Sequence, residues 1–427
     1  MRDYEMIRLQ KEVDKICNSQ QLNNKKIYLF GAGDYSRNIY QLLKAKGLEV
    51  EAIIDNDKSK QGGYCSGLRI IGLEEALRCQ NGSVRYMVCS DFWREMVKQL
   101  QTKGVKKEEI IVIKKRKDTL TEKIATAYNG KKYYDELVKK YGKTKIFLCP
   151  YTGTGDIYLI GTFWKQYTEY YHITDYVFLV LSKACYRVAE LFPIENLVLL
   201  DKMKDAENLI AYYLLKKEEM DMVILNDGWR ELPYSRTEWL RGYKGLYFTE
   251  LFRKFVFKLP DDIKPEHPEL PDYDREINDL FSLNGLIPGR TVVISPYSNT
   301  LLDLPDEFWT DIVERLVACG YTVCTNCGSD TELPIAGTKG IFVKLNMAPQ
   351  FVNHAGFFIG VRSGFCDVIS GTSAKKVILY YDRNRFYGAS AYDYFNLKNM
   401  ELCEDALELQ FSKDSIQDMM NKIMEWL

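Results

Sequence analysis

The sequence predicts an α/β protein built from three Rossmann-like domains, each with a parallel β-sheet covered by helices. Short buried strands alternate with helix-like segments along the chain, which is the pattern of a parallel sheet with right-handed crossovers. The chain has 427 residues, more than one hydrophobic core usually organises. A basic stretch over 114–143 and an acidic, proline-rich stretch over 259–270 interrupt this alternation. We therefore expect three domains separated by linkers.

The composition excludes several classes of protein. Hydrophobic residues make up 46% of the chain and charged residues 27%, as in ordinary globular proteins. The formal net charge of −1 gives no electrostatic reason to expect a nucleic-acid partner. No apolar run approaches the roughly 18 residues of a transmembrane helix, and the first residues lack the apolar core of a signal peptide. With eleven scattered cysteines, we expect a cytoplasmic protein in a reducing compartment.

The first domain contains a glycine-rich loop between a strand and a helix. We expect strands at 26–30, 50–54, 84–89 and 110–113, and helices at 34–46 and 92–103. Gly31 and Gly33 follow the first strand, and Asp55 ends the second. In this context the glycines let the backbone approach a phosphate, helix amides hold the anion, and the acid accepts ribose hydroxyl hydrogens. Ser36 replaces a third glycine, so a nucleotide-type ligand and a purely structural loop both remain open.

This part of the chain has a family resemblance. The segment YLFGAGDYSRNIYQLLKAKGLEVEAIIDNDKSKQGG resembles the small Rossmann-like domain that accompanies many bacterial polysaccharide-biosynthesis enzymes. In sugar acetyltransferases of that kind, a similar domain holds a nucleotide-sugar. The resemblance covers roughly residues 25–90 and implies a nucleotide or nucleotide-sugar as the ligand of Gly31, Gly33 and Asp55.

A second glycine-rich loop begins the second domain. Strands are expected at 145–149, 176–181, 197–200 and 221–226. Gly153, Gly155 and Asp156 follow the first of them and precede a helix-like run. The glycines leave room for a ligand to touch the backbone, and a carboxylate at the helix start can take a proton from a hydroxyl group. Aspartate is also favoured at helix starts, so a structural role is equally compatible with this loop.

The third domain has polar loops after two strands. Its strands are expected at 292–295, 321–325, 356–360 and 376–381, and its helices at 305–319 and 413–427. The two loops supply the candidate donor-binding residues, namely Ser295, Ser298, Asn299, Arg362, Ser363 and Gly364. A fixed cation beside helix-start amides is suited to a diphosphate. A structural or surface arginine is the alternative for Arg362.

Residues 145–427 resemble the heptosyltransferase type of glycosyltransferase, in which two Rossmann-like domains face each other across a cleft (the GT-B fold). The resemblance rests on the Gly155-Asp156 loop, on the segment VVISPYSNTLLDLPDEFW and on Gly360-Val-Arg-Ser363-Gly364. It implies that Asp156 is the catalytic base and that the late glycine loop lies against the donor nucleotide.

The chain departs from this family at two points. A lysine that contacts the donor phosphate in heptosyltransferases is here Leu302 or Asp303. The family's histidine after the late loop is absent, with Cys366 and Asp367 in that neighbourhood. These departures argue against ADP-heptose as the donor. Arg362, or the Lys375-Lys376 pair, could supply the missing positive charge.

The sequence contains no strong metal-binding motif. Cys324 and Cys327 form a single CxxC pair without a second pair or a histidine at zinc spacing. Asp55-Asn-Asp57 comes closest to the Asp-x-Asp that chelates a metal-bound sugar donor, but it lies in the first domain. We therefore expect metal-independent transfer, with helix dipoles and basic side chains offsetting the diphosphate charge.

The domain boundaries and the function follow from these observations. We predict a first domain at 1–120, a linker and helix at 121–144, an acceptor domain at 145–260, a linker at 261–274 and a donor domain at 275–427. The predicted reaction moves a sugar from a nucleotide-diphosphate donor to a surface-polysaccharide acceptor and needs no cofactor. The predicted partners include a membrane surface, in peripheral contact, but no nucleic acid. Two alternatives are an NAD-dependent oxidoreductase or epimerase that uses the first domain, and a non-catalytic nucleotide-sugar-binding scaffold.

Overall fold

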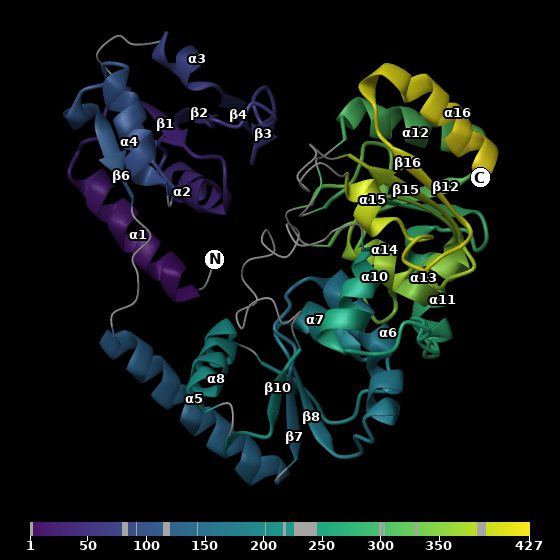
Figure 1. The fold of residues 1–427 in the computed structure, drawn as a ribbon. Helices are drawn as coiled ribbons and strands as arrows, with labels where there is room; N and C mark the ends of the chain where they lie inside the picture. Colours follow the sequence, from purple (N-terminus) through teal and green to yellow (C-terminus); the bar gives the residue numbers. More distant parts are fainter. Residues whose placement is uncertain are drawn as a thin grey trace. The chain divides into compact units, whose positions relative to one another are not determined.

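The computed structural model confirms an α/β fold with three sheets of mainly parallel strands (Figure 1). It describes residues 3–78, 84–90, 92–113, 120–142, 144–200, 202–216, 219–225, 246–298, 301, 304–328, 332–381 and 390–427. The chain divides into two compact units, Met1–Ala125 and Thr126–Leu427. The first unit contains the first predicted domain, and the second contains the sheets of both later domains. We describe each unit by itself.

The first unit is built around a six-stranded sheet of order β3-β4-β2-β1-β5-β6. Its strands are β1 (Lys26–Phe30), β2 (Val50–Ile54), β3 (Tyr64–Cys65), β4 (Leu68–Ile71), β5 (Val84–Val88) and β6 (Ile110–Val112). All neighbours are parallel except β3 and β4, which form a short antiparallel pair. The helices are α1 (Asp3–Asn18), α2 (Asp34–Ala45), α3 (Leu73–Leu77) and α4 (Trp93–Thr102), with the 3₁₀ turn η1 (Lys107–Glu109).

The sheet of the second domain has the order β10-β7-β8-β9 and is fully parallel. Its strands are β7 (Lys145–Leu148), β8 (Tyr176–Val180), β9 (Leu197–Leu199) and β10 (Met222–Ile224). The helices are α5 (Leu120–Tyr141), α6 (Thr154–Tyr170), α7 (Lys183–Ala189), α8 (Met203–Lys216) and α10 (Phe248–Leu251), followed by the π-helix η3 (Phe252–Val256). In chain order this sheet is the 3-2-1-4 arrangement of a Rossmann half.

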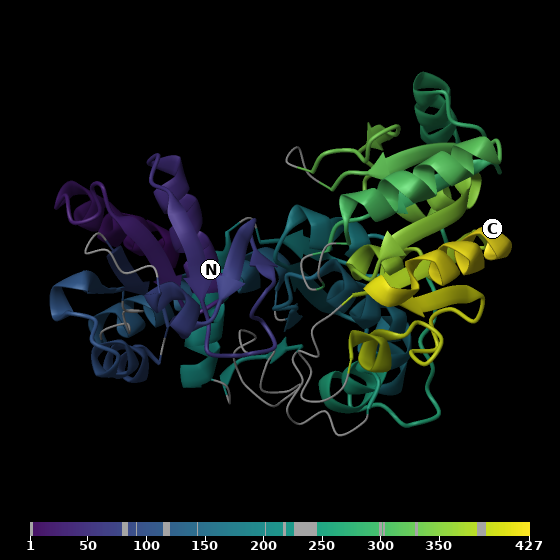
Figure 2. The ribbon, with the colours of Figure 1, turned by 90° about the horizontal axis from the view of Figure 1, so that it is seen from above.

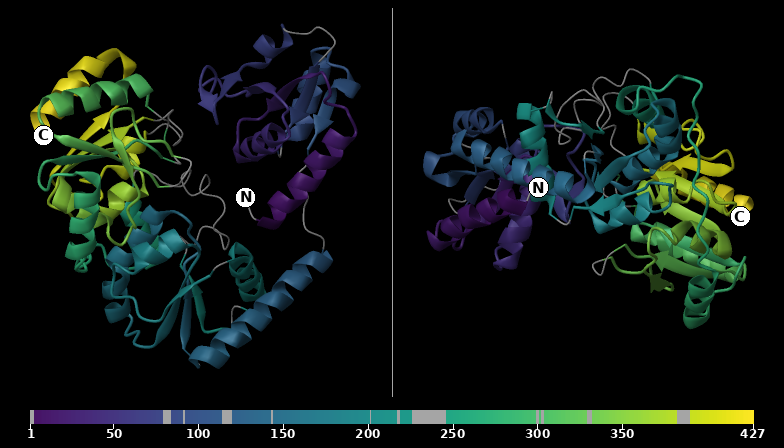
Figure 3. Two further views of the ribbon diagram at one scale, coloured as in Figure 1. Left: turned by 180° about the vertical axis from the view of Figure 1, so that it is seen from behind. Right: turned by 90° about the horizontal axis from the view of Figure 1, so that it is seen from below.

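Alternate residues of the second domain's strands face two different helix layers. Ile146 and Leu148 pack with α5 and α8, while Phe147 packs with α6 on the other face. Figure 3 shows α5 and α8 together on one side of this sheet. The linker and helix predicted at 121–144 correspond to α5, which packs on this sheet and buries its Leu137.

The third domain has a six-stranded parallel sheet of order β13-β12-β11-β14-β15-β16. Its strands are β11 (Thr291–Ser295), β12 (Thr322–Asn326), β13 (Lys339–Ile341), β14 (Gly356–Val361), β15 (Lys375–Tyr380) and β16 (Ala406–Gln410). Its helices are α11 (Asp274–Asn284), α12 (Asp306–Ala318), α13 (Ala348–Ala355), α14 (Gly364–Val368), α15 (Ala391–Phe395) and α16 (Ile416–Trp426), with the 3₁₀ turn η4 (Lys413–Ser415). In chain order this is the complete Rossmann order 3-2-1-4-5-6.

The second and third domains share one hydrophobic core. A single continuous cluster of buried residues includes Phe147 and Trp164 of the second domain and Val292 and Trp309 of the third. The terminal helix α16, drawn yellow, lies beside α12 and adds its apolar face to the same core (Figure 1, Figure 2). Helix α6 is buried from Gly155 to Trp164, as expected for a helix that is apolar on most of its faces.

The connection between the second and third domains has no helix or strand from residue 257 to residue 273. Its first part is bound to α6, where Glu266 N donates to Thr162 O at 2.9 Å. Its last part is bound to the third domain, where Tyr273 N donates to Gln350 Oε1 at 2.8 Å. The two domains are thus joined by a segment that is anchored on both sides. Over the described part of the chain, no helix is both long and apolar enough to cross a membrane.

Candidate functional site

The candidate site lies where two parallel sheets change the direction of their strand order. In the second domain this switch falls between β7 and β10, and in the third between β11 and β14. Ligands of open α/β sheets bind outside the carboxyl ends of the strands at such points. The loops after β7, β11 and β14 contain the residues that the sequence indicated for the acceptor and donor sites.

The loop after β7 places Asp156 in the first turn of α6. Gly153 is the N-cap residue, with extended backbone and no side-chain cap. Asp156 follows two residues into the helix and is 5% exposed. A carboxylate in a first helical turn is favoured by the positive end of the helix dipole. The structure therefore places a buried carboxylate at the carboxyl edge of the second domain's sheet.

The loop after β14 contains a buried ion pair. Arg362 and Asp367 are 6% and 3% exposed. The guanidinium binds the carboxylate through both oxygens, with Nη1 to Oδ2 at 3.0 Å and Nη2 to Oδ1 at 2.5 Å. It also donates to the carbonyl oxygens of Ser363 at 2.6 Å and Phe395 at 2.9 Å. This network fixes the conformation of the loop that contains Ser363 and Gly364.

The two loops are in direct contact. A Cβ atom added to Gly155 would lie 3.2 Å from the Cα of Gly364 and would also meet Oδ2 of Asp367. A Cβ atom added to Gly364 would lie 2.5 Å from the backbone nitrogen of Gly155. Neither position has space for a side chain. The glycines of both expected loops therefore let two helix starts, one from each domain, approach at backbone distance.

The charges at this contact influence one another. Burial raises the pKa of Asp367, the nearby Arg362 partly offsets this rise, and the negative charge of Asp156 adds to it. Burial is the largest single effect on Arg362 and would lower its pKa, but the charge of Asp367, together with smaller contributions from Tyr380, Cys366 and the hydrogen bond to Asp367, leaves this pKa above its ordinary value. Arg362 is thus a permanent cation paired with Asp367, and the charge of Asp156 from the other domain acts on the same Asp367 carboxylate.

The serines after β11 are connected to the same loop. Ser298 Oγ donates to the carbonyl oxygen of Arg362 at 3.1 Å. Ser295 is buried, and its Oγ accepts a hydrogen bond from Asn326 Nδ2 at 3.3 Å. Asn299, the third expected donor residue of this loop, lies outside the described residues, as do Leu302 and Asp303. Ser298 is therefore hydrogen-bonded to the loop of Ser363 and Gly364, and Gly364 contacts Gly155, the residue before Asp156.

The environment of Arg362 differs from the expectation drawn from the sequence. We expected its guanidinium to face a diphosphate. In the structure, Asp367, two main-chain carbonyls and the sulfur of Met400 accept its hydrogen bonds. Asp367, which the sequence placed only in the neighbourhood of a missing histidine, is the residue that analysis of local motifs overlooked. Its separation of five residues from Arg362 across a turn gave no periodic signal for pairing.

In the glycine-rich loop of the first domain, the acidic side chain is bound by groups of the protein itself. Gly31 has φ +108°, and Gly33 begins α2 with no atom within 4 Å of an added Cβ. Asp55 was expected to accept ribose hydroxyl hydrogens. Its Oδ2 instead accepts from Ala32 N at 2.7 Å and from Lys60 Nζ at 3.1 Å. Asp55 therefore ties the end of β2 to the glycine loop.

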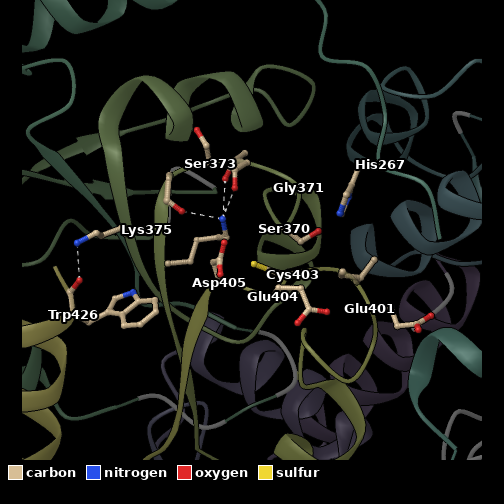
Figure 4. Close-up of a pocket in the computed structure, with 14 residues that line it drawn as sticks. His267, Ser370, Gly371, Ser373, Lys375, Glu401, Cys403, Glu404, Asp405 and Trp426 are labelled. Atoms are coloured by element: carbon tan, nitrogen blue, oxygen red, sulfur yellow. Dashed lines mark hydrogen bonds between the residues drawn. The ribbon is translucent and has the colours of Figure 1, made fainter. Parts of the chain in front are cut away.

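A cavity of about 530 Å³ lies at the opposite edge of the third domain's sheet, before β15 and β16 (Figure 4). His267 of the connecting segment lines it, together with 370–376 and 401–405. Lys375 Nζ and Lys376 Nζ each donate to main-chain carbonyl oxygens there. The expectation that these lysines could offset the donor charge is therefore wrong, because both stand at the amino end of β15.

Within the described ranges, no group of three or more histidine, cysteine, aspartate or glutamate residues is arranged to hold a metal ion. Cys324 is buried on β12, and Cys327 follows the end of that strand. Burial raises the pKa of Cys324 to about 12, so this thiol stays protonated at neutral pH.

The first unit matches a known protein family. Residues 23–111 match the family model described as C2185-like, N-terminal. No curated protein matches the chain. The match falls on the glycine-loop domain and covers less than half of the chain.

Several solved structures are similar to this chain. E. coli ADP-heptose LPS heptosyltransferase II is 13% identical, with 66% of this chain and 98% of that chain covered and a TM-score of 0.47. E. coli heptosyltransferase WaaC with ADP is 10% identical, with 66% and 100% covered and a TM-score of 0.43. A family 9 glycosyltransferase from Veillonella parvula is 13% identical, with 95% and 90% covered and a TM-score of 0.35. The assignment of a Rossmann-like fold to both later domains rests on their strand orders and not on these similarities.

Proposed function

We propose that residues 126–427 form a glycosyltransferase that moves a sugar from a nucleotide-diphosphate donor to a hydroxyl group of a glycan. The observation that carries the proposal is the contact between the two switch-point loops. It sets the Asp156 loop of one Rossmann-like domain against the Ser363-Gly364 loop of the other. A transfer between two bound substrates needs such a meeting of two sites, because the reacting atoms must be held together in one orientation.

The proposed mechanism assigns a role to each side of this contact. Asp156 takes the proton of the acceptor hydroxyl as that oxygen attacks the anomeric carbon. The bond from this carbon to the diphosphate breaks, and the diphosphate leaves with the electron pair. Ser295, Ser298, Asn299, Ser363 and Gly364 bind the diphosphate through hydroxyl, amide and main-chain N–H groups, and Arg362 fixes the loop. The reaction as proposed uses no metal ion.

The first domain is proposed to hold a nucleotide or nucleotide-sugar. The space around Gly33 at the start of α2 supports this, because a phosphate can approach backbone N–H groups where no Cβ intervenes. The acceptor is proposed to be a bacterial surface polysaccharide, reached in the cytoplasm without a transmembrane segment. These two assignments follow the resemblance of the sequence rather than a contact in the structure.

A screen of donors tests the proposed function. The full-length protein is melted with UDP-, GDP-, ADP-, CDP- and dTDP-sugars, and the donor that raises the melting temperature is tested for release of nucleoside diphosphate. Asp156→Asn should lower that release by at least about 100-fold, the contribution of a general base. Glu169→Gln, at the exposed end of the same helix, is the matched control and should retain it. Unchanged turnover in the Asp156 variant would refute the assignment.

A non-catalytic nucleotide-sugar-binding protein is the second candidate. One observation favours it: the guanidinium of Arg362 is bound to acceptors of the protein itself, which leaves its charge compensated. This candidate predicts a raised melting temperature with one donor but no release of nucleoside diphosphate. Binding of NAD with a nicotinamide absorbance change would point instead to an oxidoreductase.

A further inference from the structure

Helix α6, which begins at the candidate site, is buried on all of its faces. The ten successive residues from Gly155 to Trp164 are all buried, so more than one element must cover this helix. Phe147 of β7 packs against Trp164, with ring centroids 5.0 Å apart, and the second domain thus covers one face. Helix α14 of the third domain packs directly against α6 and covers another face. A helix of one domain is therefore enclosed by a helix of the other.

The two domains touch at backbone distance and through aromatic rings. A Cβ atom added to Gly364 would meet Oγ1 of Thr154 and would lie 2.5 Å from the backbone nitrogen of Gly155. The rings of Phe248 on α10 and Phe395 on α15 are 4.9 Å apart, edge to face. These two rings belong to the continuous hydrophobic cluster that includes residues of both domains. Neither contact leaves room for water between the domains.

The connecting segment joins the same two domains from outside. Glu266 N donates to Thr162 O of α6 at 2.9 Å. Lys264 Nζ forms an ion pair at 2.9 Å with Glu401 of the third domain, and both side chains are exposed. We call residues 264–267 the clasp, because they are bonded to both domains. Exposed ion pairs contribute little stability, so the clasp fixes the orientation of the domains, while the shared core supplies most of the stability of their contact.

His267 of the clasp also contacts both domains. Its Nδ1 lies 2.9 Å from the hydroxyl oxygen of Tyr158 on α6, and Tyr158 is 1% exposed. A Cβ atom added to Gly371 of the third domain would lie 2.7 Å from Cγ of the same imidazole ring, and Figure 4 labels both residues. Residue 371 therefore lacks a side chain at the point where the ring needs the space.

Opening of the two domains about a hinge would break all of these contacts together. Domains within one chain move relative to one another by default, unless their interface is large and apolar. Here the interface is part of a hydrophobic core, and a packed core does not deform continuously. Separation would expose the face of α6 that α14 covers. An open arrangement would therefore expose apolar surface that the observed arrangement buries.

We propose that the second and third domains act as one rigid body, held by the shared core and by the clasp, so that the candidate site is assembled before any substrate binds. The part of this inference that concerns sugar transfer rests on the proposed function. Substrates enter the site from solvent, and neither their binding nor the release of products requires the domains to separate. Because the site is already formed, binding free energy is not used to close it.

The distance between the two domains tests the inference directly. Leu215 on α8 and Leu283 on α11 are 69% and 82% exposed, one on each domain. In the full-length protein both are replaced by p-acetylphenylalanine, which takes a spin label without involving the eleven cysteines. Double electron–electron resonance should give one narrow distance, and saturating UDP-, GDP-, ADP-, CDP- and dTDP-sugars should each change it by less than about 2 Å. A second distance, or a larger change, overturns the inference.

Two glycine variants test whether the described contacts hold the domains together. Gly364→Ala places a methyl group where the backbone nitrogen of Gly155 already lies, so its distance distribution should broaden. Gly371→Ala displaces His267 and should broaden the distribution as well. Gly33→Ala, in the first unit, is the matched control and should leave the distribution unchanged. Unchanged distributions in the variants at 364 and 371 overturn the inference.

A second measurement needs neither label nor ligand. Native-state hydrogen exchange of the full-length protein is followed as denaturant is added, and the amides of β7 and β11 should reach one common free energy of opening. Separate values for the two strands overturn the inference. The result is distinguishable from that of the donor screen. A rigid pair without turnover of any donor refutes the proposed function alone, whereas turnover in a protein with two interdomain distances refutes the rigid body alone.

Discussion

Gly155 and Gly364 bring the backbones of two Rossmann-like domains into contact. A Cβ added to Gly155 would lie 3.2 Å from the Cα of Gly364, a position that the neighbouring chain already fills. The contact joins the first turn of α6 to the first turn of α14, the two helices that follow the switch-point strands. Two glycine loops that belong to different domains of the sequence are therefore in direct contact.

Gly155→Ala should destabilise this contact. The added methyl group meets the Asp367 carboxylate, which cannot yield because Arg362 holds both of its oxygens. Forcing an extra carbon into a packed site costs about 1–3 kcal/mol. A lower melting temperature and loss of sugar transfer are expected. Gly33→Ala is the control, since nothing lies within 4 Å of its Cβ, and a melting temperature equally lowered in both variants would contradict this account.

Arg362→Met should lower stability in a pH-dependent way. Removing the guanidinium leaves the buried Asp367 carboxylate without its cation, which costs about 3–5 kcal/mol. Burial already raises the pKa of Asp367, and loss of Arg362 raises it further. A raised folded-state pKa means that stability is greatest below the unfolded value, about pH 4, and is lost as pH rises through the folded value. The loss of unfolding free energy in the variant should therefore grow between pH 4 and pH 7, as measured by denaturant unfolding.

Arg315→Met provides the comparison for this prediction. Arg315 binds Asp311 at 2.9 Å across one helical turn, but both side chains are at least one-third exposed. Exposed pairs contribute about 0–1 kcal/mol. If Arg362→Met lowers the free energy of unfolding by only that much, or by the same amount at pH 4 and pH 7, the buried pair does not act as described.

The main strands could be predicted because each is a short apolar run between turn residues. The runs 26–30 and 50–54 are β1 and β2 of the structure. Strands β3, β4, β13 and β16 were missed, since each is short or only partly buried and does not stand out as an apolar run. The strand orders could not be predicted either, because order depends on contacts between distant segments rather than on local pattern.

The site was predictable only as far as it is local. Loops after strands and their glycines follow from neighbouring residues, and Asp156 was found in this way. The partners of Arg362 and Asp55 could not be found, because each is decided by how a loop folds back on itself. The sequence indicated that the side chains of Arg362 and Asp55 would each bind a ligand. In the structure, each of them binds other groups of the protein instead.

His267 should make the stability of the second compact unit depend on pH. Its Nδ1 lies 2.9 Å from Tyr158 OH, across the connection between the domains. Burial lowers the pKa of His267, a hydrogen bond with the Leu402 backbone opposes this, and the charge of Lys376 adds to it. A lowered folded-state pKa means that its stabilising contribution is full above the unfolded value, about pH 6.5, and is lost as pH falls. Each unit by which the pKa differs between the folded and unfolded states corresponds to about 1.4 kcal/mol of stability.

The measurement is the melting temperature between pH 7.5 and pH 5 for the protein and for His267→Gln. The variant should lose less stability on acidification, because it has no imidazole to protonate. His172→Asn is the matched control: His172 is exposed at φ +53°, a conformation that asparagine tolerates. Parallel curves for the protein and His267→Gln would mean that another group causes the acid sensitivity.

Exposed cysteines should react with an alkylating reagent faster than buried cysteines. Cys319 is exposed, whereas Cys89 is buried and its pKa is raised to about 12 by burial, with partial compensation from a hydrogen bond to Ser36. The thiolate is the reactive form, so a pKa this high slows alkylation by at least about a thousand-fold relative to an ordinary thiol at pH 8. Mass spectrometry after brief iodoacetamide treatment should find Cys319 modified and Cys89 intact until the protein is denatured. Cys319→Ser should remove the rapid adduct, and rapid modification of Cys89 in that variant would mean that the first domain opens under native conditions.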